Sequence, residues 1–359
     1  MKLHVAKRDT LSWQKTWGIR ILAIVLAFVV CGILCVFLTK QNPLAVFASL
    51  WEGAFGNSRR TWVTLQSMSV LLIISLGLTP AFKMQFWNIG GEGQALMGAL
   101  AAGACMIKFG EVLPNAVVIL LMIASSILAG AIWGLIPALL KAKWNTNETL
   151  STLMLNYIAT QLVAFFVIVW EVPKGSGTIG IINQSTQVGW FPEVGNKYLL
   201  AIIVALIITV FMFIYLKYTK HGYEISVVGE SVNTARYVGI SVEKVIIRTM
   251  LLSGAICGLA GLLLAGGINH TITTNIVDGQ GFTAVMVSWL AKFNPFAMIA
   301  TSLLIIFMDR GASEVASTVG LNESFSEVMT AIILFFIIGC EFFMRYKISK
   351  AKKSGKEAK

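Results

Sequence analysis

The chain has 359 residues, of which 57% are hydrophobic and only 13% are charged. Its charged residues are concentrated in a few short segments between apolar runs, which excludes a soluble enzyme with one large core and is typical of a protein that crosses a membrane several times. The formal net charge of +11 would suit a nucleic-acid-binding protein, but the positions of the basic residues favour a different explanation.

Ten apolar segments are candidates for transmembrane helices, because about 17 to 25 apolar residues in a helix cross the hydrocarbon layer. They are residues 19–38, 62–81, 92–107, 115–140, 148–170, 198–216, 249–268, 281–291, 295–309 and 324–343. The third, eighth and ninth are short, which predicts broken or half-length helices. The sequence therefore predicts an all-α polytopic membrane protein with about ten transmembrane helices.

The basic residues predict the orientation of these spans. With a cytoplasmic N-terminus and ten spans, 21 of the 28 Lys and Arg residues lie on the cytoplasmic side. This is the positive-inside bias, so topology and contact with anionic lipid explain the charge without a nucleic acid partner. We expect a cytoplasmic segment 1–18 leading into a retained signal anchor, a membrane domain 19–343, and a basic cytoplasmic tail 344–359.

A polar, glycine-rich stretch, MQFWNIGGEGQ, begins at Met84 between two apolar segments. A glutamate at membrane depth is costly and normally faces the interior of a helix bundle, so Glu92 is a candidate functional residue. The glycines allow the backbone to break, while Asn88 and Gln94 offer hydrogen-bond donors and acceptors. The alternative for Glu92 is structural, since a carboxylate near a helix N-terminus complements the helix dipole. The two roles can coexist.

A second polar cluster, NTNETLSTLMLNYIATQ, opens the fifth apolar segment. Asn147 is the predicted helix cap, with Glu148 in the first turn. Glu148 and Ser151 are three residues apart, and Thr152 and Asn156 are four apart, which predicts a polar stripe on one helical face. This stripe either caps the helix and bonds neighbouring helices, or lines a path for a solute.

Two longer polar segments separate later spans. Residues 171–197 are rich in Gly and Pro and predict an outer loop, either a simple connector or a docking surface for an extracellular partner. Residues 217–248 form an inner, partly amphipathic segment. It leads into a helix in which Gly254, Gly258 and Gly261 recur at a spacing that lets two transmembrane helices approach closely.

Several chemistries are disfavoured by what the sequence does not contain. The histidines are only three and far apart, and the five cysteines lie in apolar segments with no C-x-x-C pair, so we expect no metal site. There is no catalytic constellation and no phosphate-binding G-x-x-x-x-G-K-[ST] loop. The intramembrane Asn, Gln, Ser and Thr residues suit a path that hydrogen-bonds a passing solute. We therefore expect a transport protein, not an enzyme, with no cofactor bound by this chain.

Four motifs resemble, in this order and spacing, the permease subunits of bacterial ABC importers for nucleosides, within the permease superfamily for branched-chain amino acids and ribose. They are FWNIGGEGQALMGALAA, NETLSTLMLNYIA, GYEISVVGESVNTARYVGISVEKV and LSGAICGLAGLLLAGG. The resemblance covers nearly the whole chain beyond the first span. Ribose-type permeases tend to carry D-L-S-V-G where this chain has NIGGEGQ, and that difference favours nucleosides over sugars.

The resemblance implies a multi-pass protein of the bacterial cell membrane that works with other chains. These are a second, related permease, a cytoplasmic ATP-binding subunit that hydrolyses ATP, and an extracellular substrate-binding lipoprotein. The inner segment would be the element that couples to the ATPase. The chain departs from the family there, with Ser226 in place of the common Arg and Ser231-Val232 in place of Asn-Pro.

Two sets of candidate residues follow. Those expected along the substrate path are Asn88, Glu92, Gln94, Glu148, Ser151 and Asn156. Those expected to couple to the ATPase are Gly222, Gly229, Glu230, Ala235, Tyr237 and Gly239. The alternative functions are a permease of the same architecture for ribose or another simple sugar and, from a different class, a secondary transporter that needs no ATP.

Overall fold

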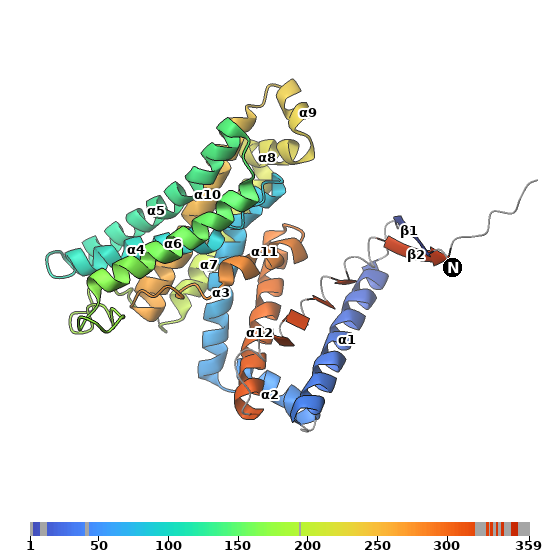
Figure 1. Cartoon of the computed structure of the whole chain (residues 1–359), viewed down its shortest axis with the longest axis horizontal. Helices are drawn as coiled ribbons and strands as arrows, with labels where there is room; N and C mark the ends of the chain where they lie inside the picture. Colours follow the sequence, from blue (N-terminus) through green and yellow to red (C-terminus); the bar gives the residue numbers. More distant parts are fainter. Residues whose placement is uncertain are drawn as a thin grey trace, which may run out of the picture. The chain divides into compact units, whose positions relative to one another are not determined.

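The computed structural model describes residues 3–7, 13–39, 43–193, 195–319, 346–350 and short pieces between 328 and 340. The chain forms two compact units, one of Met1–Thr61 with Ile305–Lys359 and the other of Trp62–Leu304 (Figure 1). Most of the tenth predicted span, 324–343, and most of the tail, 344–359, lie outside the described residues.

The first unit contains both ends of the chain. Its elements are β1 (Leu3–Lys7), α1 (Trp13–Thr39), α2 (Pro43–Phe55), the start of α3 (Ser58–Lys83), the later part of α12 (Pro295–Val319) and β2 (Tyr346–Lys350). β1 and β2 pair as antiparallel strands, with Leu3 opposite Lys350 and Lys7 opposite Tyr346. The all-α prediction is therefore incomplete, because a small two-stranded sheet joins the two terminal segments.

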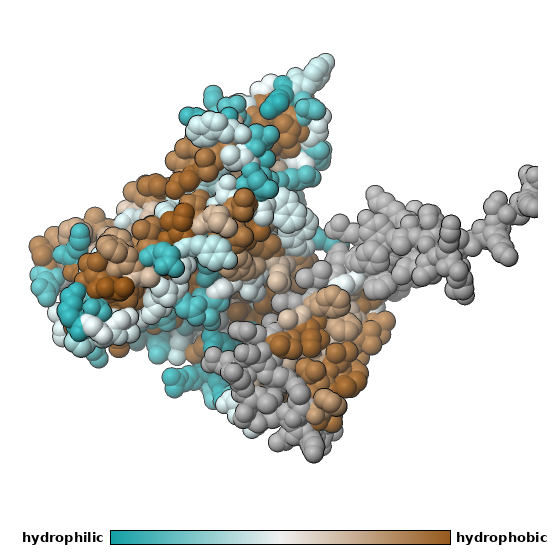
Figure 2. Space-filling view, viewed as in Figure 1, coloured by the Kyte–Doolittle hydropathy of each residue, from teal (hydrophilic) through white to brown (hydrophobic). Residues whose placement is uncertain are grey.

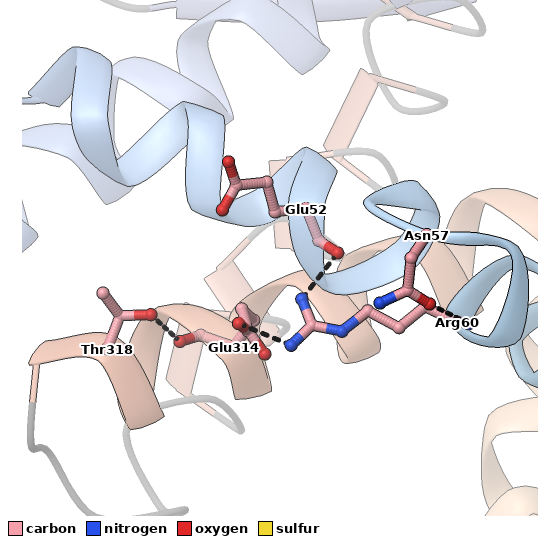
Figure 3. Close-up of polar contacts among 5 residues, drawn as sticks. All are labelled: Glu52, Asn57, Arg60, Glu314 and Thr318. Carbon is pink, nitrogen blue, oxygen red and sulfur yellow. Dashed lines mark hydrogen bonds and ion pairs between the residues drawn. The ribbon is translucent and has the colours of Figure 1, made fainter.

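Within this unit, α2 lies against α12 where Gly53 of α2 meets Gly311 of α12. A Cβ atom on Gly53 would lie 2.7 Å from the Arg310 carbonyl oxygen, so the two backbones approach closely. Figure 3 shows Arg60 beside this crossing. Its guanidinium donates to the Glu52 carbonyl oxygen at 2.8 Å and to the Glu314 carboxylate at 2.9 Å. The start of α3 is thereby held to both α2 and α12.

The ninth predicted span, 295–309, is wrong in length. Its short apolar run predicts a broken or half-length helix, but α12 continues to Val319. In this later part of α12 the Glu314 carboxylate pairs with Arg60 at 2.9 Å. The 13-residue helix α2 was not predicted, since its apolar run is too short to span a membrane.

The second unit is built from helices. They are the rest of α3, α4 (Gly91–Phe109), α5 (Asn115–Trp144), α6 (Glu148–Trp170), α7 (Leu199–Tyr218), α8 (Lys220–Glu230), α9 (Val232–Tyr237), α10 (Val242–Leu262), the π-helix η1 (Leu263–Asn269), α11 (Gln280–Leu290) and the start of α12. In Figure 1, α4, α5, α6 and α10 run alongside one another, and α8 and α9 lie at one end of them.

Six helices in the described part of the chain are long and apolar enough to cross a membrane. They are Ser58–Lys83, Asn115–Trp144, Glu148–Trp170, Leu199–Tyr218, Val242–Asn269 and Pro295–Thr318. The predicted segments 92–107 and 281–291 are also helical, as α4 and α11, but these helices are not among those that are both long and apolar enough to cross a membrane. The expectation of an all-helical membrane domain is confirmed, whereas the number of about ten spans stays a prediction.

The core of this unit depends on close helix contacts. A Cβ on Gly254 would lie 2.1 Å from the Gly130 carbonyl oxygen of α5, and one on Gly261 would lie 2.0 Å from the Ala95 carbonyl oxygen of α4. Only glycine permits such approaches, so the close packing predicted from the glycine spacing of α10 is confirmed.

Apolar residues cover much of the outer surface of this unit. Large exposed ones on α5, α6 and α7 include Leu120, Leu128, Ile132, Phe165, Ile168, Ile207 and Phe211. Figure 2 shows hydrophobic residues along the α4–α6 bundle and hydrophilic residues around α8 and α9. An apolar exterior of this kind is stable in lipid, and the polar end matches an aqueous boundary.

Candidate functional site

The first glycine break follows α3 and is held from within by Asn88. Its side chain is fully buried. The oxygen Oδ1 accepts from the Gly90 amide at 2.9 Å, and Nδ2 donates to Ser253 Oγ of α10 at 3.0 Å. These bonds satisfy backbone groups that the interrupted helix would leave without partners inside the membrane. Asn88 therefore connects the break to α10.

The polar stripe predicted on α6 reaches the same break. Asn156 accepts from the Gly93 amide at 2.9 Å through Oδ1 and donates to the Ile89 carbonyl oxygen at 2.9 Å through Nδ2. One turn earlier, Thr152 Oγ1 accepts from the Ile89 amide at 3.2 Å. Two motifs more than 60 residues apart in sequence thus form one buried site.

Gln94 completes this group, which we call the buried amide cluster: Asn88, Gln94, Thr152, Asn156 and Ser253. Gln94 is 1% exposed, and its Nε2 lies 3.4 Å from Asn88 Oδ1. Its Oε1 atom is buried and has no hydrogen-bond partner among the described residues. The cluster is neutral and contains a free acceptor, so it can hydrogen-bond an uncharged polar solute.

Glu92 points away from its own break toward a second one. Its carboxylate, which is 8% exposed, accepts from the Gly279 amide at 3.1 Å and the Gly281 amide at 2.8 Å. These amides begin α11, so the carboxylate complements the N-terminus of a different helix. A Cβ on Gly281 would lie 2.2 Å from the Glu92 nitrogen, so the starts of α4 and α11 touch. The structural role of Glu92 is to join two short helices.

Glu148 and Ser151 lie apart from the buried amide cluster. Glu148 pairs with Lys141 of α5 at 2.9 Å, and Ser151 Oγ donates to the Asn147 carbonyl oxygen at 2.8 Å. Asn147 caps α6 by accepting from the Leu150 amide at 3.1 Å, as predicted. The first turn of α6 thus serves the α5–α6 turn, while Thr152 and Asn156 bond to the break, which agrees with the alternative in which the stripe caps the helix and bonds neighbouring helices.

The inner segment forms a pair of short helices. Gly229 of α8 lies against the end of α3, because a Cβ there would be 2.2 Å from the Lys83 carbonyl oxygen. Ser231 ends α8 and caps α9 by accepting from the Thr234 amide at 3.2 Å. An ion pair between Glu224 and Arg248 connects α8 to α10. The segment is thus connected to both α3 and α10.

The other coupling candidates divide into buried and exposed residues. Gly222 and Ala235 are buried, whereas Glu230 is exposed. Tyr237 is 92% exposed, and Gly239 follows it with φ +81°, a left-handed conformation that favours glycine. The tyrosine is therefore presented to the surroundings at the tip of α9.

The outer segment 171–197 is packed rather than loose along part of its length. Asn183 Nδ2 donates to the Met106 carbonyl oxygen of α4 at 2.9 Å, and the Trp190 ring stacks on His270 with centroids 3.9 Å apart. Nearer α6, the amides of Gly175 and Gly177 lower the pKa of the exposed Glu171 carboxyl. These contacts connect the outer segment to α4 and to the residue after η1.

Sequence reasoning missed the partners of the candidate residues. Ser253 and Gly281 were not singled out, although both bond to a predicted site residue. The glycines on either side of Gln280, directly before a short apolar segment, do mark the second break in the sequence, but they do not show which side chain bonds to it.

Comparison with known proteins shows the family to which the chain belongs. Residues 62–338 match the family described as "Branched-chain amino acid transport system / permease component". The chain is 29% identical to the nucleoside ABC transporter permease protein NupB of Lactococcus lactis subsp. cremoris, over 92% of this chain and 93% of that protein. It is 28% identical to the guanosine ABC transporter permease protein NupP of Bacillus subtilis, over 93% and 96%. The glucose ABC transporter permease protein TsgB13 of Haloferax volcanii is 27% identical, over 98% and 94%. The chain belongs to this permease family and is a multi-pass protein of the cell membrane.

Proposed function

We propose that this chain is the permease subunit of an ATP-driven importer and forms the translocation path for nucleosides. The observation that carries this proposal is the similarity, over more than 90% of both chains, to permease proteins named for nucleosides and guanosine. The neutral buried amide cluster supports it, because nucleosides are uncharged and rich in hydrogen-bonding groups.

The path, in this proposal, runs beside the first break. Asn88 and Asn156 hold the backbone beside the path, Gln94 offers its amide oxygen to the solute, and Glu92 keeps α11 in place along the path. Glu148 and Ser151 lie at the inner mouth, near the α5–α6 turn. Gln94 Oε1, which lacks a partner among the described residues, is the acceptor available to a solute.

The proposed coupling element is α8 with α9. ATP binding would close the partner ATPase and move this element, which contacts the Lys83 end of α3 through Gly229 and α10 through the Glu224–Arg248 ion pair. Both helices lead to the buried amide cluster, α3 through the break and α10 through Ser253. The spans would then expose the path alternately to each side. The exposed side chains of Glu230 and Tyr237 are available for contact with the ATPase.

The complete importer would contain further chains. We propose a second related permease, a cytoplasmic ATP-binding subunit that binds ATP, and an extracellular substrate-binding lipoprotein, with no cofactor or metal held by this chain. About ten spans with both termini in the cytoplasm complete the proposal. The pairing of β1 with β2 supports termini on one side of the membrane, because the two strands must meet there.

A sugar permease of the same architecture is the second candidate. The specific observation that favours it is the 27% identity to the glucose permease protein of Haloferax volcanii over 98% of this chain. A secondary transporter would share the fold but retain uptake in the absence of the ATP-binding subunit.

The test is uptake of labelled uridine and adenosine by cells that lack the chain and then regain it, with ribose, glucose and free bases as competitors. Restored uptake that unlabelled nucleosides compete and sugars do not would support the proposal. Uptake of sugar alone would select the second candidate. Gly229→Ala should abolish uptake without reducing membrane insertion, because its Cβ would displace α8 from Lys83. Gly18→Ala is the matched control, since a Cβ there meets nothing within 4 Å.

A further inference from the structure

Four aromatic side chains gather beside the first break. Phe82 lies in the last turn of α3, and Trp87 lies in the break. Trp289 lies near the end of α11, and Phe293 follows α11. The rings of Trp87 and Trp289 stack with centroids 5.3 Å apart and planes 23° apart. Phe82 lies 6.2 Å from both tryptophan rings, and Phe293 lies 5.1 Å from the Trp289 ring.

These four rings differ in exposure. Phe82 is only 3% exposed and contacts both tryptophan rings, whereas Trp87 is 46% and Trp289 is 40% exposed. Neither indole N–H donates a hydrogen bond to any residue that the structure describes. The pair therefore presents two flat faces and two hydrogen-bond donors.

The backbone that presents the pair is firmly held. Trp87 directly precedes Asn88, whose side chain is bonded at both ends. α11 is held at its start by Glu92, and next to Trp289 the hydroxyl of Ser288 donates to the Ser75 carbonyl oxygen at 3.1 Å. Side chains positioned in this way lose little entropy when a ligand binds.

Tryptophan is common at the boundary of a membrane, where single indoles face lipid headgroups. That explanation accounts for an exposed tryptophan such as Trp144, which is 68% exposed and makes no ring contact with another described aromatic residue. It does not account for two indoles, 202 positions apart, that stack on each other over a buried phenylalanine beside the buried amide cluster.

We propose that Trp87 and Trp289 form a stacking subsite for the base of the nucleoside on its way through the membrane. A planar base can lie against an outer face of the stacked indole pair, while an indole N–H donates to an oxygen or nitrogen of the base. Every base has a flat π face, so the subsite accepts several nucleosides and favours purines for their larger ring area. This inference rests on the proposed nucleoside function.

The experiment compares maximal uptake of labelled adenosine and uridine by the full transporter with Trp87→Ala, Trp289→Ala and the control Trp144→Ala. Replacing an aromatic side chain that stacks on a base by alanine typically weakens binding about five- to hundredfold. We expect each of the first two variants to lower adenosine uptake about tenfold and uridine uptake about threefold. The adenosine-to-uridine ratio should therefore fall about threefold, and the control should leave it unchanged.

Trp87→Phe and Trp289→Phe keep an aromatic face and should retain most of the adenosine uptake and most of the uridine uptake. The amount of transporter in the membrane is measured for every variant. If Trp87→Ala and Trp289→Ala lower both nucleosides equally, or neither, the pair has only a packing or lipid-facing role and the subsite is wrong. A wild-type transporter that takes up sugar and no nucleoside would overturn the proposed function as well. The wild-type measurement thus separates the two failures.

Discussion

The two glycine breaks of the second unit are held in different ways. The first, between α3 and α4, is buried and receives side chains from α6 and α10. The second, before α11, has exposed Asn275 and Asp278 side chains that bond to each other at 3.1 Å, and its amides are satisfied by Glu92 of α4. Helix α11 therefore depends on α4 for its start, whereas α4 is held by longer helices.

This difference reflects where water can reach. A buried backbone group without a partner is costly, so side chains bond to the Ile89, Gly90 and Gly93 amides and the Ile89 carbonyl group of the first break. The second break can use water for some groups and needs protein only at the helix N-terminus. The comparison predicts an order for the loss of stability. Substitutions at the contact between the two breaks should cost most, those at the first break less, and those at the second break least.

The largest effect is expected from Gly281→Val. The new side chain would start 2.2 Å from the Glu92 nitrogen and force the starts of α4 and α11 apart. Overpacking of this kind costs about 3 kcal/mol or more when backbone must move. Membrane level and the midpoint of thermal unfolding of the purified complex should both fall. Gly18→Val, at an open position, should leave both unchanged, and equal behaviour of the two variants would contradict the contact.

Asn156→Leu should come next. It removes both hydrogen-bond partners that Asn156 itself supplies to the first break, leaving the Gly93 amide and the Ile89 carbonyl group unsatisfied. Each buried group left without a partner costs about 1–3 kcal/mol. Unfolding in detergent measures the loss. Asn156→Gln, which keeps one acceptor and one donor without a charge, should lose less, and the reverse order would show that these hydrogen bonds are not the link.

Glu92→Gln sharpens the comparison, because it should weaken one break alone. The amide oxygen can still accept one hydrogen bond, but the charge is lost, at a cost of about 1–2 kcal/mol. Amide hydrogen exchange should accelerate at Gly279 and Gly281, while Gly93, held by Asn156, stays protected. Faster exchange at Gly93 of the same size would mean that the two breaks open together.

Asn275→Ala is expected to have the smallest effect. Its bond to Asp278 is exposed, so water replaces it, and the change in unfolding free energy should stay within about 0.5 kcal/mol. A loss as large as that of Asn156→Leu would show that the second break is held as tightly as the first.

Much of the helical framework followed from the sequence, because a long apolar run must satisfy its own backbone groups in lipid and forms a helix whatever its neighbours. Every predicted apolar segment that lies within the described residues is helical. The errors occurred where local pattern is weak: α2 is short, α12 continues through charged residues, and the two terminal strands depend on each other across more than 300 residues.

The sequence by itself determined the class of protein, the positions of the polar residues in apolar surroundings and the glycine spacing that lets α10 approach its neighbours. Only the tertiary structure decided what those residues contact. Asn88 and Asn156 bond around one break, Glu92 reaches the other, and Trp87 meets Trp289, all through pairs brought together by helix packing. Hydropathy acts along the chain, whereas a hydrogen bond needs a partner within about 3 Å, and the fold alone supplies that partner.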